Sequence, residues 1–212
     1  MTRQFLYRHG DVGRSKVQRA AEWVREYDPS IEVRAVDRWI GGPDDLADLT
    51  EGADVIVGGL DGEPGSQLWI NEVAVRAGVP FVTGGMTRTQ LLYCSVDPGR
   101  SRCLRCNEAG LPGPDDPAGA AAQRLVRSRP FVNALIGPLT MQFGSLVAYE
   151  ALRYLTGFEP PRAAGAHIVL DLETGLVPRW EPFAEDPDCP VCAAATPAAR
   201  RGPSAPASSA SA

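Results

Sequence analysis

The chain lacks a long apolar run and a leader in which charges precede an apolar core. Its longest uncharged apolar stretch, residues 132–146, is interrupted by Asn133, Pro138 and Gln142, whereas a helix that spans a bilayer needs about 20 predominantly apolar residues. Residues 1–8 carry charges, but no apolar segment follows them as it would in a secretory signal peptide. We therefore expect a cytoplasmic protein. In that reducing compartment, cysteines favour metal binding or catalysis over disulfides.

Basic segments are also scarce. The net charge is −5 and the isoelectric point is about 5.1, and neither a long basic run nor a basic helix face occurs. A nucleic-acid partner is therefore not expected, because binding to phosphates depends on clustered lysine and arginine side chains. Hydrophobic residues make up 44% of the sequence, which is enough for the core of one good-sized domain.

A glycine-rich phosphate-binding loop is missing from the 212 residues. The pairs Gly58-Gly59 and Gly84-Gly85 lie at the ends of expected strands, but no G-x-G-x-x-G pattern occurs. Such a loop normally opens a doubly wound sheet and presents a helix N-terminus to a phosphate group. Its absence argues against an NAD-dependent oxidoreductase. His9 and His167 are isolated in the sequence and give no sign of an active-site histidine.

Apolar periodicity divides the body of the chain into alternating helices and strands. Helices are expected from the Gly13-Arg-Ser-Lys16 start to Asp28, at 43–49, at 66–77 and from about 132 to 154. Strands are expected at 31–35, 54–60, 80–84 and 90–96, followed by a hairpin of 166–172 and 176–180. The alternation implies right-handed crossovers and a parallel sheet, to which 90–96 would add a second, more antiparallel layer. The predicted fold class is α/β, with a Rossmann-like, mainly parallel sheet and an added antiparallel part.

The composition changes near the end of the chain. Residues 194–212 consist largely of alanine, proline and serine, and such a segment buries too little apolar surface to order itself. We therefore expect one folded domain over residues 1–193 and a disordered tail over residues 194–212.

The cysteines carry the clearest chemical signal. Cys103 with Cys106, and Cys189 with Cys192, form two C-x-x-C pairs. Each pair can place two thiolates on one tetrahedral ion, and four sulfurs leave no position for a catalytic water. A redox pair or two disulfides are the alternatives, but two pairs in a cytoplasmic chain favour structural zinc, which would clip the end of the chain to its middle. Cys94 lies in an apolar strand and fits a buried core residue better than a nucleophile.

Four features, taken in order, resemble the ThiF/MoeB/HesA family of ATP-dependent enzymes that activate ubiquitin-like proteins and related peptides. They are Thr2-Arg3-Gln4-Phe5-Leu6-Tyr7 with Asp11-Val12-Gly13-x-x-Lys16, Asp61 with Ile70-Asn71, the two C-x-x-C pairs, and the helix at 144–157. The resemblance covers about residues 2–192. It implies a homodimer that adenylates the C-terminal carboxylate of a small ubiquitin-like carrier protein or peptide, with ATP and magnesium and with release of pyrophosphate.

The resemblance also implies roles for particular residues. Arg3, Lys16 and Asp61 would be catalytic: Arg3 and Lys16 would contact the ATP phosphates, Gln4 would lie beside them, and Asp61 would hold magnesium or position the reacting groups. Two cations and a carboxylate suit a magnesium–triphosphate site. Lys16 suits a helix start poorly unless an anion lies nearby. Taken alone, Arg3 and Lys16 also fit exposed surface charges, and Asp61 fits a turn.

Departures from the family pattern leave a second function open. The glycine-rich loop unit is absent, Asp61 is followed by Gly-Glu-Pro-Gly where the family has asparagine, and residues 107–131 contain no cysteine for a thioester relay. The 212-residue form is expected to be inactive by itself if nothing supplies the loop. The alternative function is a non-catalytic partner or peptide-binding subunit of a ThiF-like complex. Arg8 and Asn71 are weaker site candidates, for which structural roles are favoured.

Overall fold

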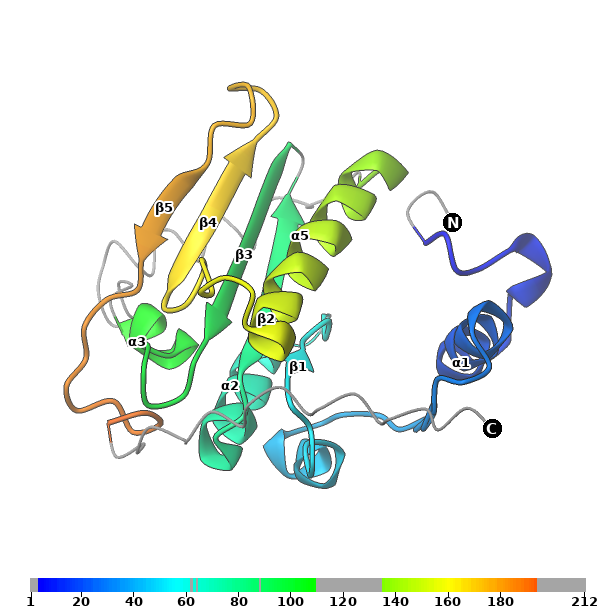
Figure 1. The fold of residues 1–212 in the computed structure, drawn as a ribbon, viewed down its shortest axis with the longest axis horizontal. Helices are drawn as coiled ribbons and strands as arrows, with labels where there is room; N and C mark the ends of the chain where they lie inside the picture. The colour runs from blue at the N-terminus through cyan, green and yellow to red at the C-terminus, as the bar shows by residue number, and fades with distance from the viewer. Residues whose placement is uncertain (1–3, 62, 64, 88, 110–134, 194–212) are drawn as a thin grey trace, which may run out of the picture.

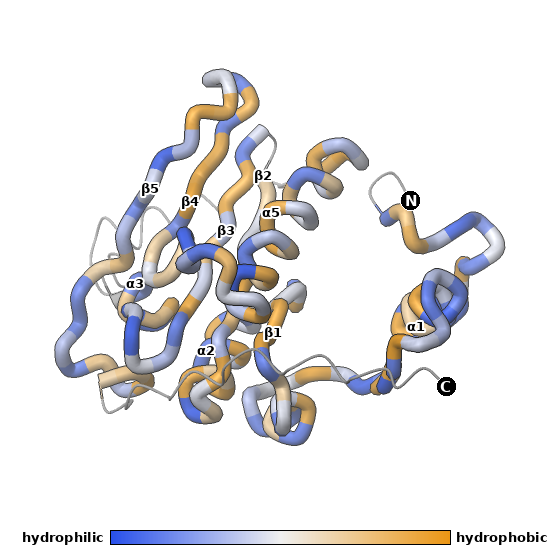
Figure 2. The backbone as a smooth tube through the Cα atoms, in the orientation of Figure 1, coloured by the Kyte–Doolittle hydropathy of each residue, from blue (hydrophilic) through white to orange (hydrophobic). Residues whose placement is uncertain are grey.

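A single sheet organises the computed structural model, which describes residues 4–61, 63, 65–87, 89–109 and 135–193. Within these residues the strands follow one another across the sheet in the order β1-β2-β3-β4-β5 (Figure 1). Their bounds are Ile56–Val57 for β1, Phe81–Thr87 for β2, Gln90–Val96 for β3, Ala166–Asp171 for β4 and Arg179–Pro182 for β5. Hydropathy differs across the sheet, since β4 is largely hydrophobic whereas β5 is largely hydrophilic and exposed (Figure 2).

Two helices cover opposite faces of this sheet (Figure 1). Helix α2, Ser66–Ala77, belongs to a core cluster with Phe81, whereas α5, Gly137–Thr156, belongs to a second cluster with Val82. Phe81 and Val82 are neighbours in β2, and successive side chains of a strand point to opposite faces. The sheet therefore separates two apolar clusters, and a short helix, α3 (Leu104–Ala109), lies next to the first.

A buried carboxylate joins α5 to the sheet. Glu150 is fully buried, and its Oε1 accepts hydrogen bonds from Ser95 Oγ at 2.9 Å and from the backbone N–H of Ala163 at 2.8 Å. Its Oε2 lies 2.9 Å from Nη1 of Arg153, one turn further along α5. A buried charge is tolerated only when it is paired and hydrogen-bonded. This network therefore fixes α5 against β3 and against the loop that leads to β4.

The N-terminal part of the described chain lies beside this body. It contains a 3₁₀ turn, η1 (His9–Asp11), helix α1 (Lys16–Tyr27) and a 3₁₀ helix, η2 (Pro43–Leu49). Figure 1 shows α1 apart from the sheet. Only Ala21 of α1 is buried, and Tyr27 and Trp39 are 76% and 79% exposed. Leu46 of η2 packs against the first apolar cluster, whereas α1 contributes no residue to either cluster.

The prediction of a mainly parallel sheet is wrong. Only β1 and β2 pair in parallel, across the α2 crossover, and the other three pairs are antiparallel. Residues 31–35 are not a strand, so the expected first crossover is absent from the described chain. Gln90–Val96 forms the expected strand, but it joins the same sheet by a turn after β2 and starts no second layer. Alternation identifies strands without identifying their neighbours, which are set by contacts far apart in sequence.

The helix boundaries follow the local signals more closely. Helix α1 ends before Asp28, η2 spans Pro43–Leu49, and α2 ends at Gly78, whose φ of 67° favours glycine. The expected hairpin is β4 paired with β5. The long helix begins at Gly137, with Pro138 in its first turn, where proline is accommodated without a bend. Residues 132–134 of the predicted helix lie outside the described residues.

One predicted strand end is also corrected. Gly84 and Gly85 lie inside β2 rather than at its end. A Cβ atom on Gly84 would lie 2.2 Å from the carbonyl oxygen of Leu92 and 2.8 Å from Cε2 of Phe143 in α5. Gly84 therefore allows strand and helix to pack closely, a role that has no connection with phosphate binding.

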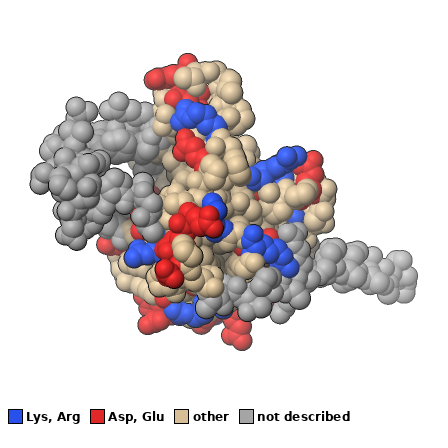
Figure 3. All heavy atoms as spheres, turned by 90° about the vertical axis from the view of Figure 1, so that its left-hand side faces the viewer, with Lys and Arg blue, Asp and Glu red and all other residues tan. Residues whose placement is uncertain are grey.

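No described helix has both the length and the apolar character required to cross a bilayer. On the face that Figure 3 presents, basic and acidic side chains are interspersed. The charges seen on this face therefore do not separate into one basic and one acidic area.

Candidate functional site

Two turns bring the four paired cysteines together. Cys103 directly precedes α3 and Cys106 lies in its first turn, whereas Cys189 and Cys192 lie in a turn beyond β5. The Sγ–Sγ distances are 3.9 Å for Cys103–Cys106, 3.7 Å for Cys103–Cys189 and 3.3 Å for Cys106–Cys192. All four sulfurs lie within 4.8 Å of one another. The end of the described chain is thereby held against its middle.

The geometry and donor set of this cluster are consistent with zinc. Tetrahedral coordination with Zn–S bonds of about 2.3 Å places the sulfurs roughly 3.8 Å apart, close to the spacing of these four. The cysteines are free thiols, and sulfurs joined in a disulfide would lie only about 2.05 Å apart. Cys103, Cys106 and Cys189 are buried, so water has little access. Four thiolates would complete the coordination shell, which indicates a structural rather than a catalytic ion.

Ionisation of the four cysteine thiols would be stabilised by a bound cation. Burial raises the pKa of Cys106 to about 11, and burial also raises the pKa of Cys192 well above its usual range. For Cys189, burial opposes ionisation, but backbone N–H groups of Cys192 and Val191 donate to its sulfur and the net pKa is lowered. Four neighbouring thiolates would repel one another without a metal. A divalent ion would supply the compensating charge.

Two polar side chains hold the surroundings of the cluster in place. Fully buried Asn71 on α2 accepts a hydrogen bond at its Oδ1 from the backbone N–H of Leu104, at 2.9 Å, and so ties the start of α3 to α2. Arg102 donates to the carbonyl oxygen of Phe183 and to Glu185, each at 2.9 Å. Asn71 therefore has the structural role that was favoured for it. Arg102 was not singled out from the sequence, because its partners lie more than 80 positions away.

The other two isolated candidates also have structural surroundings. Cys94 is buried, and burial raises the pKa of its thiol to about 12, so it is a poor nucleophile. His167 lies in β4 with its ring edge-to-face against Phe183, and burial lowers its pKa. Neither residue takes part in a cluster of catalytic groups within the described chain.

The segment before α1 builds a turn that presents Lys16. Gly13 has a φ of 86°, which favours glycine, and Ser15 caps the helix by accepting a hydrogen bond from Gln18 N–H at 3.4 Å. Asp11 lies 2.9 Å from Nε of Arg19 and accepts a hydrogen bond from the backbone N–H of Arg8 at 2.8 Å. That backbone hydrogen bond, together with nearby arginines, lowers the pKa of Asp11.

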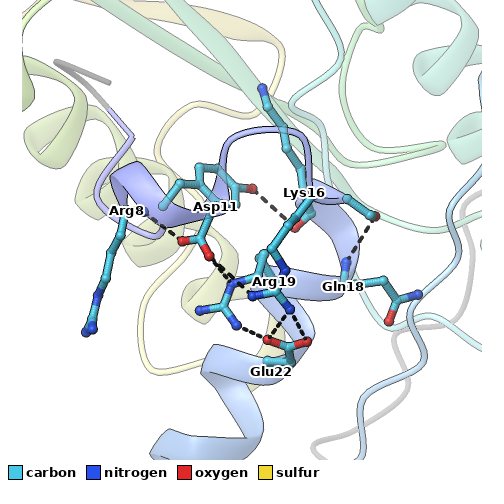
Figure 4. Close-up of polar contacts among 9 residues, drawn as sticks. Arg8, Asp11, Lys16, Gln18, Arg19 and Glu22 are labelled. Atoms are coloured by element: carbon cyan, nitrogen blue, oxygen red, sulfur yellow. Dashed lines mark hydrogen bonds and ion pairs between the residues drawn. The ribbon is translucent and has the colours of Figure 1, made fainter.

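Lys16 takes no part in these ion pairs. Figure 4 shows its side chain pointing away from Asp11, Arg19 and Glu22. Its ammonium group lies 5.9 Å from the centroid of the Tyr7 ring, and the first turn of α1 contains no acidic residue. Lys16 is the only lysine in the sequence, in which the other basic residues are arginines apart from two histidines. The lone ammonium group therefore stands at the positive end of a helix without a carboxylate partner on that turn.

An apolar cavity of about 440 Å³ lies between α1 and β1. Val17, next to Lys16, and Leu60, next to Asp61, both line it. Asp61 is exposed and forms no hydrogen bond or ion pair within the described chain. Lys16 and Asp61 are thus sequence neighbours of two lining residues, but neither belongs to the lining itself.

The structure shows less about the other site candidates, Arg3, Gln4 and Arg8. Arg3 lies outside the described residues. Gln4 and Arg8 are exposed. The carbonyl of Gln4 accepts a hydrogen bond from Tyr7 N–H at 3.3 Å, so its backbone belongs to a turn, and its side chain remains available to a ligand.

Comparisons with known proteins agree with one another. The ThiF family model matches residues 1–191. Protein HesA of Leptolyngbya boryana is 31% identical over 197 residues, which cover 91% of this chain and 63% of HesA. The sulfur carrier protein ThiS adenylyltransferase of Escherichia coli is 28% identical, and the match covers 91% of this chain and 70% of that enzyme.

A similar fold is found among solved structures. The crystal structure of E. coli MccB with ATP superposes with a TM-score of 0.74 at 22% identity, over 91% of this chain and 55% of MccB. At this identity the likeness concerns the fold. The chain thus spans 63% of the length of HesA and just over half of MccB.

Proposed function

We propose, because this chain belongs to the ThiF family, that it acts in the ATP-dependent adenylation of the C-terminal carboxylate of a small ubiquitin-like carrier protein or peptide. An oxygen of that carboxylate would attack the α-phosphorus of ATP. The bond from the α-phosphorus to the bridging oxygen would break, pyrophosphate would leave, and an acyl-adenylate would form. Such a reaction needs positioned substrates and neutralised phosphate charge more than it needs a protein nucleophile.

The placement of Lys16 is the observation that carries this proposal. Lys16 is the first residue of α1, and the N-terminal end of a helix favours anions. Its neighbour Val17 lines the cavity beside β1. Lys16 would bind ATP phosphates there. Asp61, which follows the lining residue Leu60, offers an exposed carboxylate, a ligand type that Mg²⁺ prefers. Arg3 and Gln4 would add phosphate contacts on the strength of the family resemblance alone. Magnesium, when bound, would neutralise charge on the phosphates.

The zinc proposed for the cysteine cluster has a separate role. It would be held by Cys103, Cys106, Cys189 and Cys192, whose spacing and burial fit a closed tetrahedral site. It would stabilise the fold and take no part in adenylation. On the strength of the family resemblance, we also propose that the protein forms a homodimer.

The second candidate is a non-catalytic partner subunit that binds a carrier protein or peptide. The sequence favours it in one respect, because Asp61 is followed by Gly-Glu-Pro-Gly, where the family pattern described above has asparagine. A partner subunit would keep the fold and the zinc site without forming an adenylate.

Lys16 allows a direct test, because no other lysine competes with it. An acyl-phosphate derivative of ATP transfers its acyl group to an amine near the terminal phosphate, and ATP leaves. We expect Lys16 to be acylated at least about tenfold faster than the N-terminal amine, and excess MgATP to protect it, with both sites quantified by peptide mass spectrometry. Equal acylation of the two amines, unaffected by MgATP, would refute the assigned phosphate role. Protected labelling without any ATP–pyrophosphate exchange would favour the partner subunit.

A further inference from the structure

A second cavity runs along the outer side of α2. It has a volume of about 810 Å³, and α2 lines it from Gly65, before the helix, to Gly78, after it. A helix of 12 residues is about 18 Å long, so the cavity is an elongated groove. It shares no lining residue with the cavity beside β1. We call it the α2 groove.

The walls of the α2 groove are mostly apolar. Leu68, Trp69 and Val75 contribute from α2, and Pro190 and Val191 contribute from the turn between Cys189 and Cys192. The cysteine cluster therefore supplies the wall that faces the helix. An apolar groove of this length between two rigid elements is typical of sites that bind peptide segments.

A buried amide in the lining of the groove lacks a partner. The Oδ1 atom of Asn71 accepts the hydrogen bond from Leu104, but its Nδ2 has no hydrogen-bond partner in the part of the chain that the structure describes. Asn71 is fully buried and is one of the residues that line the groove. An unsatisfied buried donor is unfavourable, because it has lost its hydrogen bond to water without gaining another. A carbonyl or carboxylate oxygen bound in the groove would remove that cost.

The charged residues of the lining favour an acidic ligand. Arg76 and Arg105 line the groove together with one carboxylate, Glu72. Arg76 pairs with Glu72, and Arg105 pairs with Glu108 at 3.2 Å, each on its own helix. The arginine side chains are 62% and 48% exposed, and exposed pairs of this kind contribute little to stability. An incoming carboxylate can therefore exchange with either pair at little cost.

We propose that the α2 groove binds an extended, acidic segment of a partner protein. An extended segment leaves backbone carbonyls free for Nδ2 of Asn71, whereas a helix uses its carbonyls internally. Alternate side chains of that segment would pack against Trp69 and Val191, and acidic side chains would meet both Arg105 and Arg76. The groove is independent of the nucleotide site proposed above, so it would serve to hold a partner rather than to carry the reaction.

Random dodecapeptides displayed on phage and panned against the zinc-loaded protein provide the probe. We expect enrichment of peptides that combine acidic and apolar residues. Fluorescein-labelled synthetic copies should bind the wild-type protein, and a version with lysine at the acidic positions should bind at least about tenfold more weakly. Failure to enrich such peptides, or equal binding of the lysine version, would overturn the proposal.

Variants of the protein test whether the peptide binds in the groove. Arg105→Glu reverses an exposed charge, and Asn71→Asp keeps the oxygen that accepts the Leu104 N–H while removing the amide donor. Each should weaken peptide binding at least about tenfold. Arg179→Glu, the matched control on exposed β5, should leave binding within about twofold. Binding that survives Arg105→Glu, or that Arg179→Glu reduces as much, contradicts the assignment, and that comparison stands even if Asn71→Asp fails to fold.

Discussion

The cysteine cluster and the segment that carries Lys16 are built in contrasting ways. Cys103, Cys106 and Cys189 are buried, and a hydrogen bond from Leu104 N–H to Asn71 ties the neighbouring helices α3 and α2 together. The Lys16 segment contributes one buried residue, Ala21, and its ion pairs lie near the surface. A closed metal centre can be completed by residues from one chain. A site for ATP needs an open cavity and side chains that remain unpaired until the ligand arrives.

The same contrast appears in the energetics. Buried groups such as Glu150 have every charge paired, so the loss of one partner leaves another unsatisfied. Exposed groups such as Lys16 lose little stability when they are replaced, and their value lies in the ligand that they contact. Substitutions in the two regions should therefore separate stability from function.

The largest effect is expected from Cys189→Ser. Removing one of four ligands should abolish zinc binding, because a structural site depends on its complete donor set, and metal binding is linked to folding. A loss of about 3 kcal/mol or more would lower the melting temperature by roughly 10 °C in a chain of this size. Metal content by mass spectrometry and a thermal melt measure both consequences. Cys94→Ala is the matched control, and it should retain one zinc per chain. Unchanged zinc content in Cys189→Ser would rule out the four-cysteine site.

Zinc affinity should also depend steeply on pH. Because burial raises the pKa of Cys106 to about 11 and that of Cys192 further, both thiols are protonated near neutrality without metal. Zinc must displace these protons, so affinity falls as pH falls, by about 1.4 kcal/mol per pH unit for each proton released. Chelator competition between about pH 6 and 8 should give a log-affinity slope of roughly two or more. A slope near zero would contradict thiolate ligation.

The stability of the metal-free protein should depend on pH in the opposite direction, falling as pH rises. The folded-state pKa values of Cys106 and Cys192 lie above their unfolded values, so the folded state loses stability as pH rises through the unfolded thiol pKa of about 8.5. Denaturation of the metal-free and zinc-loaded forms at increasing pH distinguishes the two cases. Stability of the metal-free form that rises above that pH would show that these pKa shifts are wrong.

Glu150→Gln should weaken the body of the fold. The substitution removes the buried carboxylate that pairs with Arg153 and leaves it the exposed carboxylate of Glu159, so it should lower the free energy of unfolding by about 3 kcal/mol. Glu159→Gln is the matched control, because Glu159 also pairs with Arg153, at 3.4 Å, but is 44% exposed, and it should cost less than about 1 kcal/mol. Urea denaturation compares the two. Equal losses would mean that burial does not govern this network.

The smallest effect on stability, and a distinct effect on function, is expected from Lys16→Ala. Its side chain is exposed and lies 5.9 Å from the centroid of the Tyr7 ring, so the melting temperature should stay within about 2 °C. ATP affinity should fall at least about tenfold, equivalent to 1.4 kcal/mol, as measured by calorimetry. Lys16→Arg retains the charge and should recover part of that loss. If ATP affinity is the same in Lys16→Ala and wild type, the contrast between the two regions fails.

Local signals in the sequence identified several elements well. The helix ends expected at Asp28, at 43–49 and at 66–77 are reproduced by the structure, because helix ends depend on residues within one turn. The C-x-x-C pairs likewise identified four sulfurs that come together. In each case the residues that form the feature lie within a few positions of one another, so their spacing in the sequence largely sets their arrangement in space.

Pairing over long distances was not predictable in the same way. The strand expected at 31–35 has no partner in the described chain, and the run at 54–60 is a strand only at Ile56–Val57. The partners of Glu150 include Ser95, 55 positions away, and those of Arg102 lie beyond β5. The α2 groove shows the same limit, because its walls come from α2 and from the distant turn that holds Cys189 and Cys192. The apolar periodicity of one segment does not reveal which distant segment it will contact.

Adenylation by the product of the complete gene is the most direct test of the proposed function. ATP–pyrophosphate exchange would be measured with a panel of small ubiquitin-like carrier proteins and peptides from the same organism, each with a free or an amidated C-terminus. Exchange that requires a free carboxylate, and that falls at least about tenfold in Lys16→Ala, is the result we predict. Exchange that is absent with every carrier, or equal with amidated C-termini, would contradict adenylation.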